Sequence, residues 1–78
     1  MHFLKEIPCD EIKILLYEWN SKYIVKFETP YMEQTIKFSI LDFTSQKEIE
    51  ELVTSPSIIN QIIINMHELS KIIITHNP

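Results

Sequence analysis

The chain has 78 residues, of which 45% are hydrophobic and 10% aromatic, and its formal net charge at pH 7 is −4. These values exclude a disordered chain and predict one folded domain over residues 1–78. The single cysteine, Cys9, excludes an internal disulfide, and the absence of glycine and arginine argues against glycine-dependent phosphate loops and arginine readout of nucleic-acid bases.

The first part of the domain, residues 1–43, has the period-two alternation of an antiparallel sheet. We expect three strands in a meander, predicted at Ile12–Leu16, Tyr23–Glu28 and Gln34–Leu41. The third strand alternates most regularly, with Ile36, Phe38 and Ile40 on one face and Thr35, Lys37 and Ser39 on the other. The segment before Pro8 has two alternatives: it remains outside the sheet, or it adds an edge strand through Phe3 and Leu4.

The second part, residues 44–76, changes to helical periodicity. Ser45 and Glu48 fit a capping box, in which the serine accepts a backbone hydrogen bond and the glutamate bonds back. A short helix follows, with Ile49, Leu52 and Val53 on one face. We expect Thr54-Ser55-Pro56 to end that helix and begin another, with Ser55 as its N-cap and Pro56 in its first turn.

The last segment, Ser57–His76, predicts a long helix, because its apolar residues form one stripe at helical spacing: Ile58, Ile59, Ile62, Ile63, Met66, Leu69 and Ile73. Asn77 is expected to cap it before Pro78. Short strands at Ile62–Ile64 and Ile72–Ile74 are the alternative, since isoleucine is a mediocre helix former. The predicted fold class is α+β, a three-stranded antiparallel meander followed by a short and a long α-helix packed on one face.

The turn between the first two strands decides which side chains share a face. A two-residue turn at Asn20-Ser21 pairs Lys13 with Glu28 and gathers on one face Ile12, Ile14, Leu16, Tyr23, Val25 and Phe27. A three-residue turn slips the register by one and places Leu15, Tyr17 and Trp19 with Tyr23, Val25 and Phe27 instead. We favour the two-residue turn, because asparagine tolerates the positive φ that it requires, although serine is a poor substitute for glycine.

In the favoured register, the second face of the sheet keeps large apolar side chains that the helices do not cover. We call this set the outer-face patch; it consists of Leu15, Tyr17, Trp19 and Ile24, ringed by Lys13, Lys22, Lys26 and Lys37. Exposed apolar patches with tyrosine and tryptophan mark contact surfaces, so we expect a homodimer or a complex with another protein. In two alternatives the outer-face patch is not available to a partner: the chain's own ends fold over this face, or the lysine stems shield it.

No catalytic constellation is recognised in the sequence. His2, His67 and His76 are widely separated, and the cluster of Glu48, Glu50 and Glu51 fits favourable placement near a helix start. We therefore expect no enzymatic activity, no metal, no cofactor and no small-molecule ligand. The predicted function is a small non-catalytic self-associating or protein-interaction module. The alternative is weak binding of single-stranded nucleic acid, with Tyr17 and Trp19 stacking on bases, although the acidic balance argues against it.

The apolar runs of the sequence are short. Met1–Pro8 lacks the run that a signal peptide requires, and the longest unbroken apolar stretch, Ile14–Tyr17, is far below the ~20 residues of a membrane span. We therefore expect a cytoplasmic protein.

The segment Trp19–Glu28 (WNSKYIVKFE), followed by Glu33–Lys37 (EQTIK), resembles a pattern in a group of small uncharacterised bacterial proteins. These proteins often carry glycine where Ser21 stands here, which suits a two-residue turn. The resemblance covers part of the sheet and implies a bacterial origin and the sheet architecture. It assigns no catalytic or binding residue.

Overall fold

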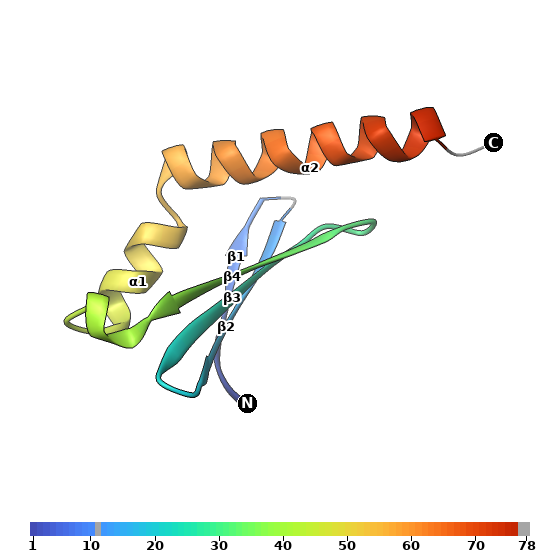
Figure 1. Cartoon of the computed structure of the whole chain (residues 1–78). Coiled ribbons are helices and arrows are strands. Elements are labelled where there is room, and N and C mark those ends of the chain that lie inside the picture. The colour runs from blue at the N-terminus through green and yellow to red at the C-terminus, as the bar shows by residue number, and fades with distance from the viewer. Residues whose placement is uncertain (11, 77–78) are drawn as a thin grey trace.

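The computed structural model of the chain describes residues 1–10 and 12–76, with side chains as far as Leu69. Four strands form one antiparallel sheet in the order β1-β2-β3-β4: β1 is His2–Cys9, β2 is Ile12–Trp19, β3 is Lys22–Glu28 and β4 is Glu33–Ser39. A 3-10 turn at Ile40–Asp42 leads to α1, Gln46–Val53, and then to α2, Pro56–His76 (Figure 1). The α+β class and the two predicted helices are confirmed.

The prediction of three strands is wrong, because the segment around Pro8 pairs with β2 from His2 to Cys9. Two features hid this strand from the sequence: the register shifts between Phe3 and Lys5, and Pro8 lacks a backbone N–H. Both are tolerated on an edge strand, since one side of such a strand needs no ladder hydrogen bonds. The edge-strand alternative through Phe3 and Leu4 is therefore the correct one, and the strand runs further than expected.

The turn at Asn20-Ser21 has the favoured two-residue form. Its two residues have φ values of 53° and 58°, and positive φ at both positions is the signature of a type I′ hairpin turn. Lys13 lies opposite Glu28 and Trp19 opposite Lys22, which confirms the predicted register. The three-residue alternative is wrong.

The inner face of the sheet carries the hydrophobic core. All six residues assigned to this face are buried: Ile12, Ile14, Leu16, Tyr23, Val25 and Phe27. Ile49 and Val53 of α1 and Ile62 and Met66 of α2 pack against them. Burial of apolar surface contributes roughly 25 cal/mol for each Å2 removed from water. The packing of α1 and α2 against the inner face of the sheet is therefore the main source of stability.

The N-terminal cap of α1 differs in detail from the predicted box. The Ser45 hydroxyl accepts a hydrogen bond from the Glu48 N–H, as expected. The Glu48 carboxylate, however, accepts from the N–H and the hydroxyl of Thr44 rather than from the Ser45 N–H. The hydrogen bonds of the Glu48 carboxylate therefore go to the residue before the N-cap, and they fix Thr44 to the first turn of α1.

The junction between the helices also differs from the expectation. Pro56 begins α2, where its missing N–H is harmless, as predicted. The Ser55 hydroxyl does not act as an N-cap acceptor; it donates to the Leu52 carbonyl at the end of α1. Leu52 is itself exposed, so of the predicted apolar face of α1 only Ile49 and Val53 are buried.

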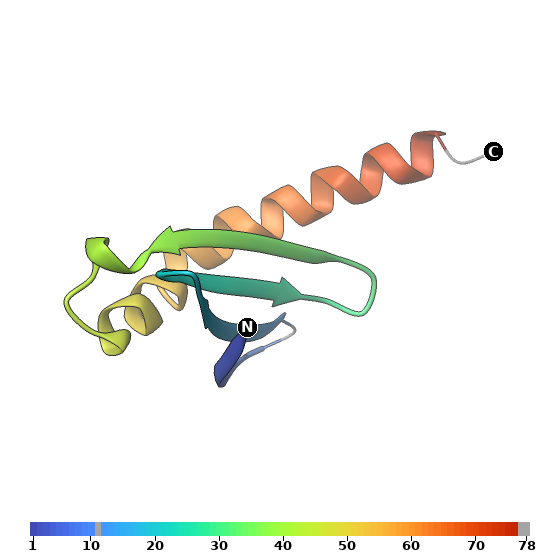
Figure 2. The ribbon, with the colours of Figure 1, turned by 60° about the horizontal axis from the view of Figure 1, so that its bottom comes forward.

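The segment that follows is one helix of 21 residues, so the strand alternative is wrong. Ile62 and Met66 of α2 are buried against the sheet, and this packing outweighs the modest helix propensity of isoleucine. The predicted cap at Asn77 lies outside the described residues. A helix of this length spans ~31 Å, whereas a strand of seven or eight residues spans ~23–26 Å. The last turns of α2 therefore extend past the sheet (Figures 1 and 2), and the longest dimension of the molecule is 46 Å.

Candidate functional site

The outer-face patch forms on one face of the sheet as the register predicts. Tyr17 lies opposite Ile24, which in turn lies opposite Lys37, so the three side chains share one row across β2, β3 and β4. The neighbouring rows carry the other members of the patch, Lys13, Leu15, Trp19, Lys22 and Lys26. The structure thus brings all eight predicted residues together.

The exposure of Ile24 differs from the expectation. Ile24 is only 4% exposed, although no helix covers its face, and it is not part of the inner core cluster. Its cross-strand neighbours, Tyr17 and Lys37, have side chains long enough to close over a branched residue between them. Ile24 is therefore a buried centre of the outer face and offers little contact area to a partner, which corrects its predicted role.

Tyr17 is covered on two sides by its own chain. The ring of Phe3, on β1, meets the Tyr17 ring edge to face with centroids 5.4 Å apart. The Lys26 ammonium lies 5.2 Å from the centroid of the same ring, within the range of a cation–π contact. Both shielding alternatives are therefore realised in part, since the N-terminal segment and a lysine stem each cover a portion of the patch.

What remains open lies at one end of the face, which we call the aromatic end and define as Phe3, Tyr17 and Trp19. Trp19 is 51% exposed and Phe3 is 49% exposed, and Tyr17 is half-buried between Phe3 and Lys26. Phe3 was missed as a patch residue because β1 was not recognised as a paired strand. The sequence feature that could have indicated this strand is the apolar pair Phe3-Leu4 before Lys5.

The carboxylates of the outer face are unevenly distributed along the strands. Glu28 and Glu33 lie opposite each other at the end away from Trp19, and Glu6 lies on β1 in the next row. Lys22 lies opposite Trp19 at the aromatic end. All three carboxylates therefore lie toward one end of the face, together with Lys13 and Lys26, whereas the aromatic end carries Lys22.

Two of the four ring lysines form ion pairs on this face. Lys13 lies 3.8 Å from Glu6, and Lys26 lies 3.8 Å from Glu33. Such exposed pairs contribute little to stability. Lys22 and Lys37 are exposed and form no ion pair with any other residue that the structure describes, so their charges are available to a second surface.

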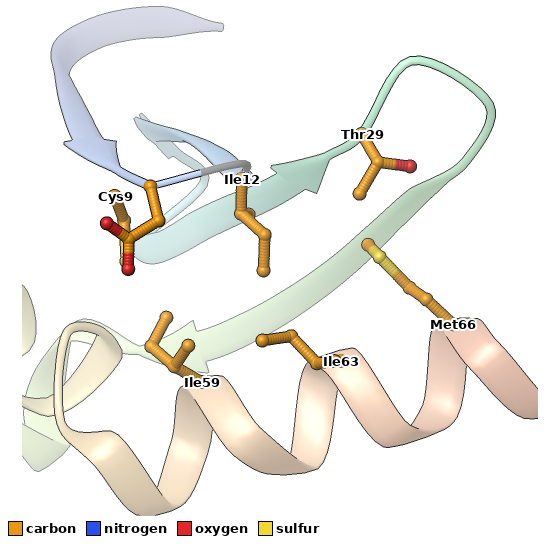
Figure 3. Close-up of a pocket in the computed structure, with 7 residues that line it drawn as sticks. Cys9, Ile12, Thr29, Ile59, Ile63 and Met66 are labelled. Atoms are coloured by element: carbon orange, nitrogen blue, oxygen red, sulfur yellow. The ribbon is translucent and has the colours of Figure 1, made fainter.

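A groove on the opposite side of the sheet was not predicted. It has a volume of about 640 Å3 and lies between α2 and the strand ends, lined by Cys9, Asp10, Ile12, Thr29, Ile59, Ile63 and Met66. Figure 3 shows Ile59, Ile63 and Met66 rising from α2 toward Ile12 and Thr29. The groove exists because α2 diverges from the sheet toward its C-terminal end. The apolar stripe in the sequence does not reveal this divergence.

The groove has few polar groups with which to do chemistry. Among the lining residues that the structure describes, Asp10 carries the one carboxylate and Cys9 the one thiol, and four of the other five are apolar. Within the described part of the chain, no three histidine, cysteine or acidic side chains come close enough to hold a metal ion. Among the described helices, none is both long and apolar enough to cross a membrane.

Comparisons with known proteins return no match: no family model, no curated protein and no solved structure resembles this chain significantly. The resemblance of Trp19–Lys37 to small bacterial proteins therefore stays a prediction. The surface geometry described above carries the functional argument.

Proposed function

We propose that this protein is a small non-catalytic module that associates with a second copy of itself through the outer face of its sheet. The observation that carries the proposal is that Phe3, which lies opposite Tyr17, and Trp19, two residues further along β2, are each about half exposed at the aromatic end. Tryptophan and tyrosine provide large rigid contact areas and dominate the centres of protein interfaces. Large apolar side chains that gather in one exposed region, as these do, can mark an interaction surface.

A second copy suits this face because of the charges on it. A two-fold axis that lies between the two sheets, parallel to their faces and perpendicular to the strands, would lay the lysine-bearing aromatic end of one copy over the end of the other that carries Glu28 and Glu33. Lys22 would then approach the region of Glu28 and Glu33 in the second copy. Complementary potentials of this kind favour one relative orientation of the two copies.

Size gives a further reason for association. A domain of this length buries only ~60% of the surface that its unfolded chain exposes, so its stability is marginal. Small domains without disulfides or metals commonly gain stability from oligomerisation. The proposed contact would add apolar burial around Trp19 that one copy cannot provide.

The alternative as a nucleic-acid binder has no comparable observation in its favour. Base stacking needs open aromatic faces, and the Tyr17 ring already packs against Phe3 and Lys26. Of the two residues predicted to stack on bases, only Trp19 remains about half exposed, and the net charge of the protein is −4.

Sedimentation equilibrium over a wide range of concentration tests the proposal. The wild-type mass should rise above 9.3 kDa, and Trp19→Lys should lower it while leaving the circular dichroism spectrum unchanged. Tyr31→Lys is the matched control, because Tyr31 is also an exposed aromatic residue but lies in the β3–β4 loop. A wild type that stays monomeric, or equal losses from both variants, contradicts the proposal.

A further inference from the structure

The two edges of the sheet are protected to different degrees. β1 carries an irregularity between Phe3 and Lys5 and a proline at position 8, and both features discourage pairing with another strand. β4, at the other edge, has neither; it is a regular seven-residue strand, Glu33–Ser39. Figure 2 shows β4 at one edge of the sheet, with β3 as its strand neighbour on one side.

The hydrogen bonds that flank β4 establish which of its backbone groups face outward. Ile40 N–H donates to the Ser21 carbonyl at one end of the β3–β4 ladder, and Thr29 N–H donates to the Met32 carbonyl at the other. Bonded pairs alternate along an antiparallel ladder, so even-numbered β4 residues bond to β3. The N–H and C=O groups of the odd-numbered residues therefore point away from the sheet: Glu33, Thr35, Lys37 and Ser39.

These outward groups are self-complementary around Thr35. If β4 pairs antiparallel with β4 of a second copy and Thr35 faces its own counterpart, Glu33 of each copy lies opposite Lys37 of the other. All three positions then form bonded pairs, which gives about six backbone hydrogen bonds across the seam. The side chains of these residues lie together on the outer face and are exposed.

Charge supports this register in particular. Glu33 lies directly opposite Glu28 within its own sheet, an unfavourable pairing that Lys26 relieves from 3.8 Å. Lys37 has no ion partner in the described part of its own chain. Centring the seam on Lys37 instead would oppose two lysines, whereas centring it on Thr35 opposes a lysine and a glutamate twice.

We propose that two copies of this protein pair through their β4 edges, in antiparallel register about Thr35, to form one continuous eight-stranded sheet. This inference goes beyond the proposed function because it uses the edge of the sheet, while the proposed self-association uses the outer face. The edge contact alone gives a dimer of twice 9.3 kDa. Both contacts together give larger assemblies, because they have different two-fold axes.

The sharpest test is a short thiol cross-link across the seam. In a bonded antiparallel pair the Cα and Cβ atoms are both ~5.5 Å apart, which is too far for an unstrained disulfide but within reach of a short bismaleimide. In a Cys9→Ser background, Thr35→Cys should cross-link to a covalent dimer when treated with this reagent. Lys37→Cys in the same background is the matched control and should cross-link far less, because it faces position 33. Preferential cross-linking at position 37, or none at 35, overturns the register.

A second test weakens the seam without touching the fold. Thr35→Pro removes an outward N–H, which an edge strand tolerates, and should raise the dissociation constant at least ~tenfold since each copy loses a seam hydrogen bond. Lys37→Glu should also weaken the dimer, and Lys47→Glu on α1, with the same change of charge, should not. A monomeric wild type overturns the proposal and leaves Lys37 as a charge that protects the edge.

The edge and face proposals fail in different ways. If Thr35→Pro lowers the mass and Trp19→Lys does not, the edge contact is supported and the face contact is wrong. The reverse result overturns the edge contact alone. If each variant lowers a larger wild-type mass to that of a dimer, both contacts exist.

Discussion

The Nζ atom of Lys5 lies 2.7 Å from Oε1 of Glu50, and this ion pair joins the edge strand β1 to α1. The hydrogen bond from Lys5 lowers the pKa of Glu50 below its ordinary value, and a weaker hydrogen bond from Gln46 acts in the same direction. Partial burial opposes them by disfavouring the charged carboxylate. The pair thus ties the strand that the sequence did not reveal to the helical layer.

Replacing Lys5 should raise the pKa of Glu50. We expect Lys5→Met to shift it upward toward 4.5, as measured by NMR titration of the side-chain carboxyl carbon. Because the folded-state pKa is depressed, the pair stabilises the protein above the unfolded-state pKa and ceases to do so as pH falls through the folded-state value. The Lys5 side chain is about half exposed, so the loss of stability at neutral pH should be only about 0.5 kcal/mol.

Lys47→Met is the control for this titration, since Lys47 lies on α1 but forms no described ion pair with Glu50. It should leave the Glu50 pKa in place. An unchanged pKa in Lys5→Met would mean that the ion pair does not persist in solution.

Glycine at position 21 should stabilise the protein. Ser21 has a φ of 58°, where a Cβ atom is unfavourable, and its neighbour Asn20 tolerates this region better. After the extra chain entropy of glycine is subtracted, Ser21→Gly should raise the free energy of unfolding by ~0.5–1 kcal/mol. Urea titration measures this as a higher midpoint at constant slope. Ser57→Gly, in the first turn of α2, should lower the midpoint instead.

Replacing a buried and an exposed leucine by alanine should have very different effects on stability. Leu16 is 0% exposed and lies on the inner face, whereas Leu41 is 91% exposed in the 3-10 turn. Leu16→Ala should lower the free energy of unfolding by ~2–5 kcal/mol, because it removes buried methyl groups and leaves a cavity. Leu41→Ala should change it by less than ~0.5 kcal/mol. Thermal unfolding followed by circular dichroism compares them, and similar shifts for both variants would contradict the assigned faces.

The inner face was predictable because its signal is local. Ile12, Ile14 and Leu16 alternate with other residues, and the Asn20-Ser21 turn determines how that alternation meets β3. Both inferences depend on neighbours in sequence, and the structure confirms them. The same holds for α2, whose apolar stripe has helical spacing over its whole length.

The features that escaped prediction depend on contacts between distant segments. β1 lacks clear alternation and contains Pro8, so its pairing is evident only once β2 is in place. The partial shielding of Tyr17 follows from this, since Phe3 arrives with β1. The groove under α2 likewise depends on the angle at which the helix leaves the sheet, and no residue pattern encodes that angle.

Truncation of Ile24 should destabilise the protein far more than truncation of Trp19, although both residues belong to the outer-face patch. Ile24 is 4% exposed between Tyr17 and Lys37, so Ile24→Ala should lower the free energy of unfolding by ~2–4 kcal/mol in dilute, monomeric protein. Trp19 is 51% exposed at the strand end, and Trp19→Ala should lower it by less than ~1 kcal/mol. Urea titration at low concentration measures both values. Equal losses would mean that Trp19 is part of the folded core and is not available for association.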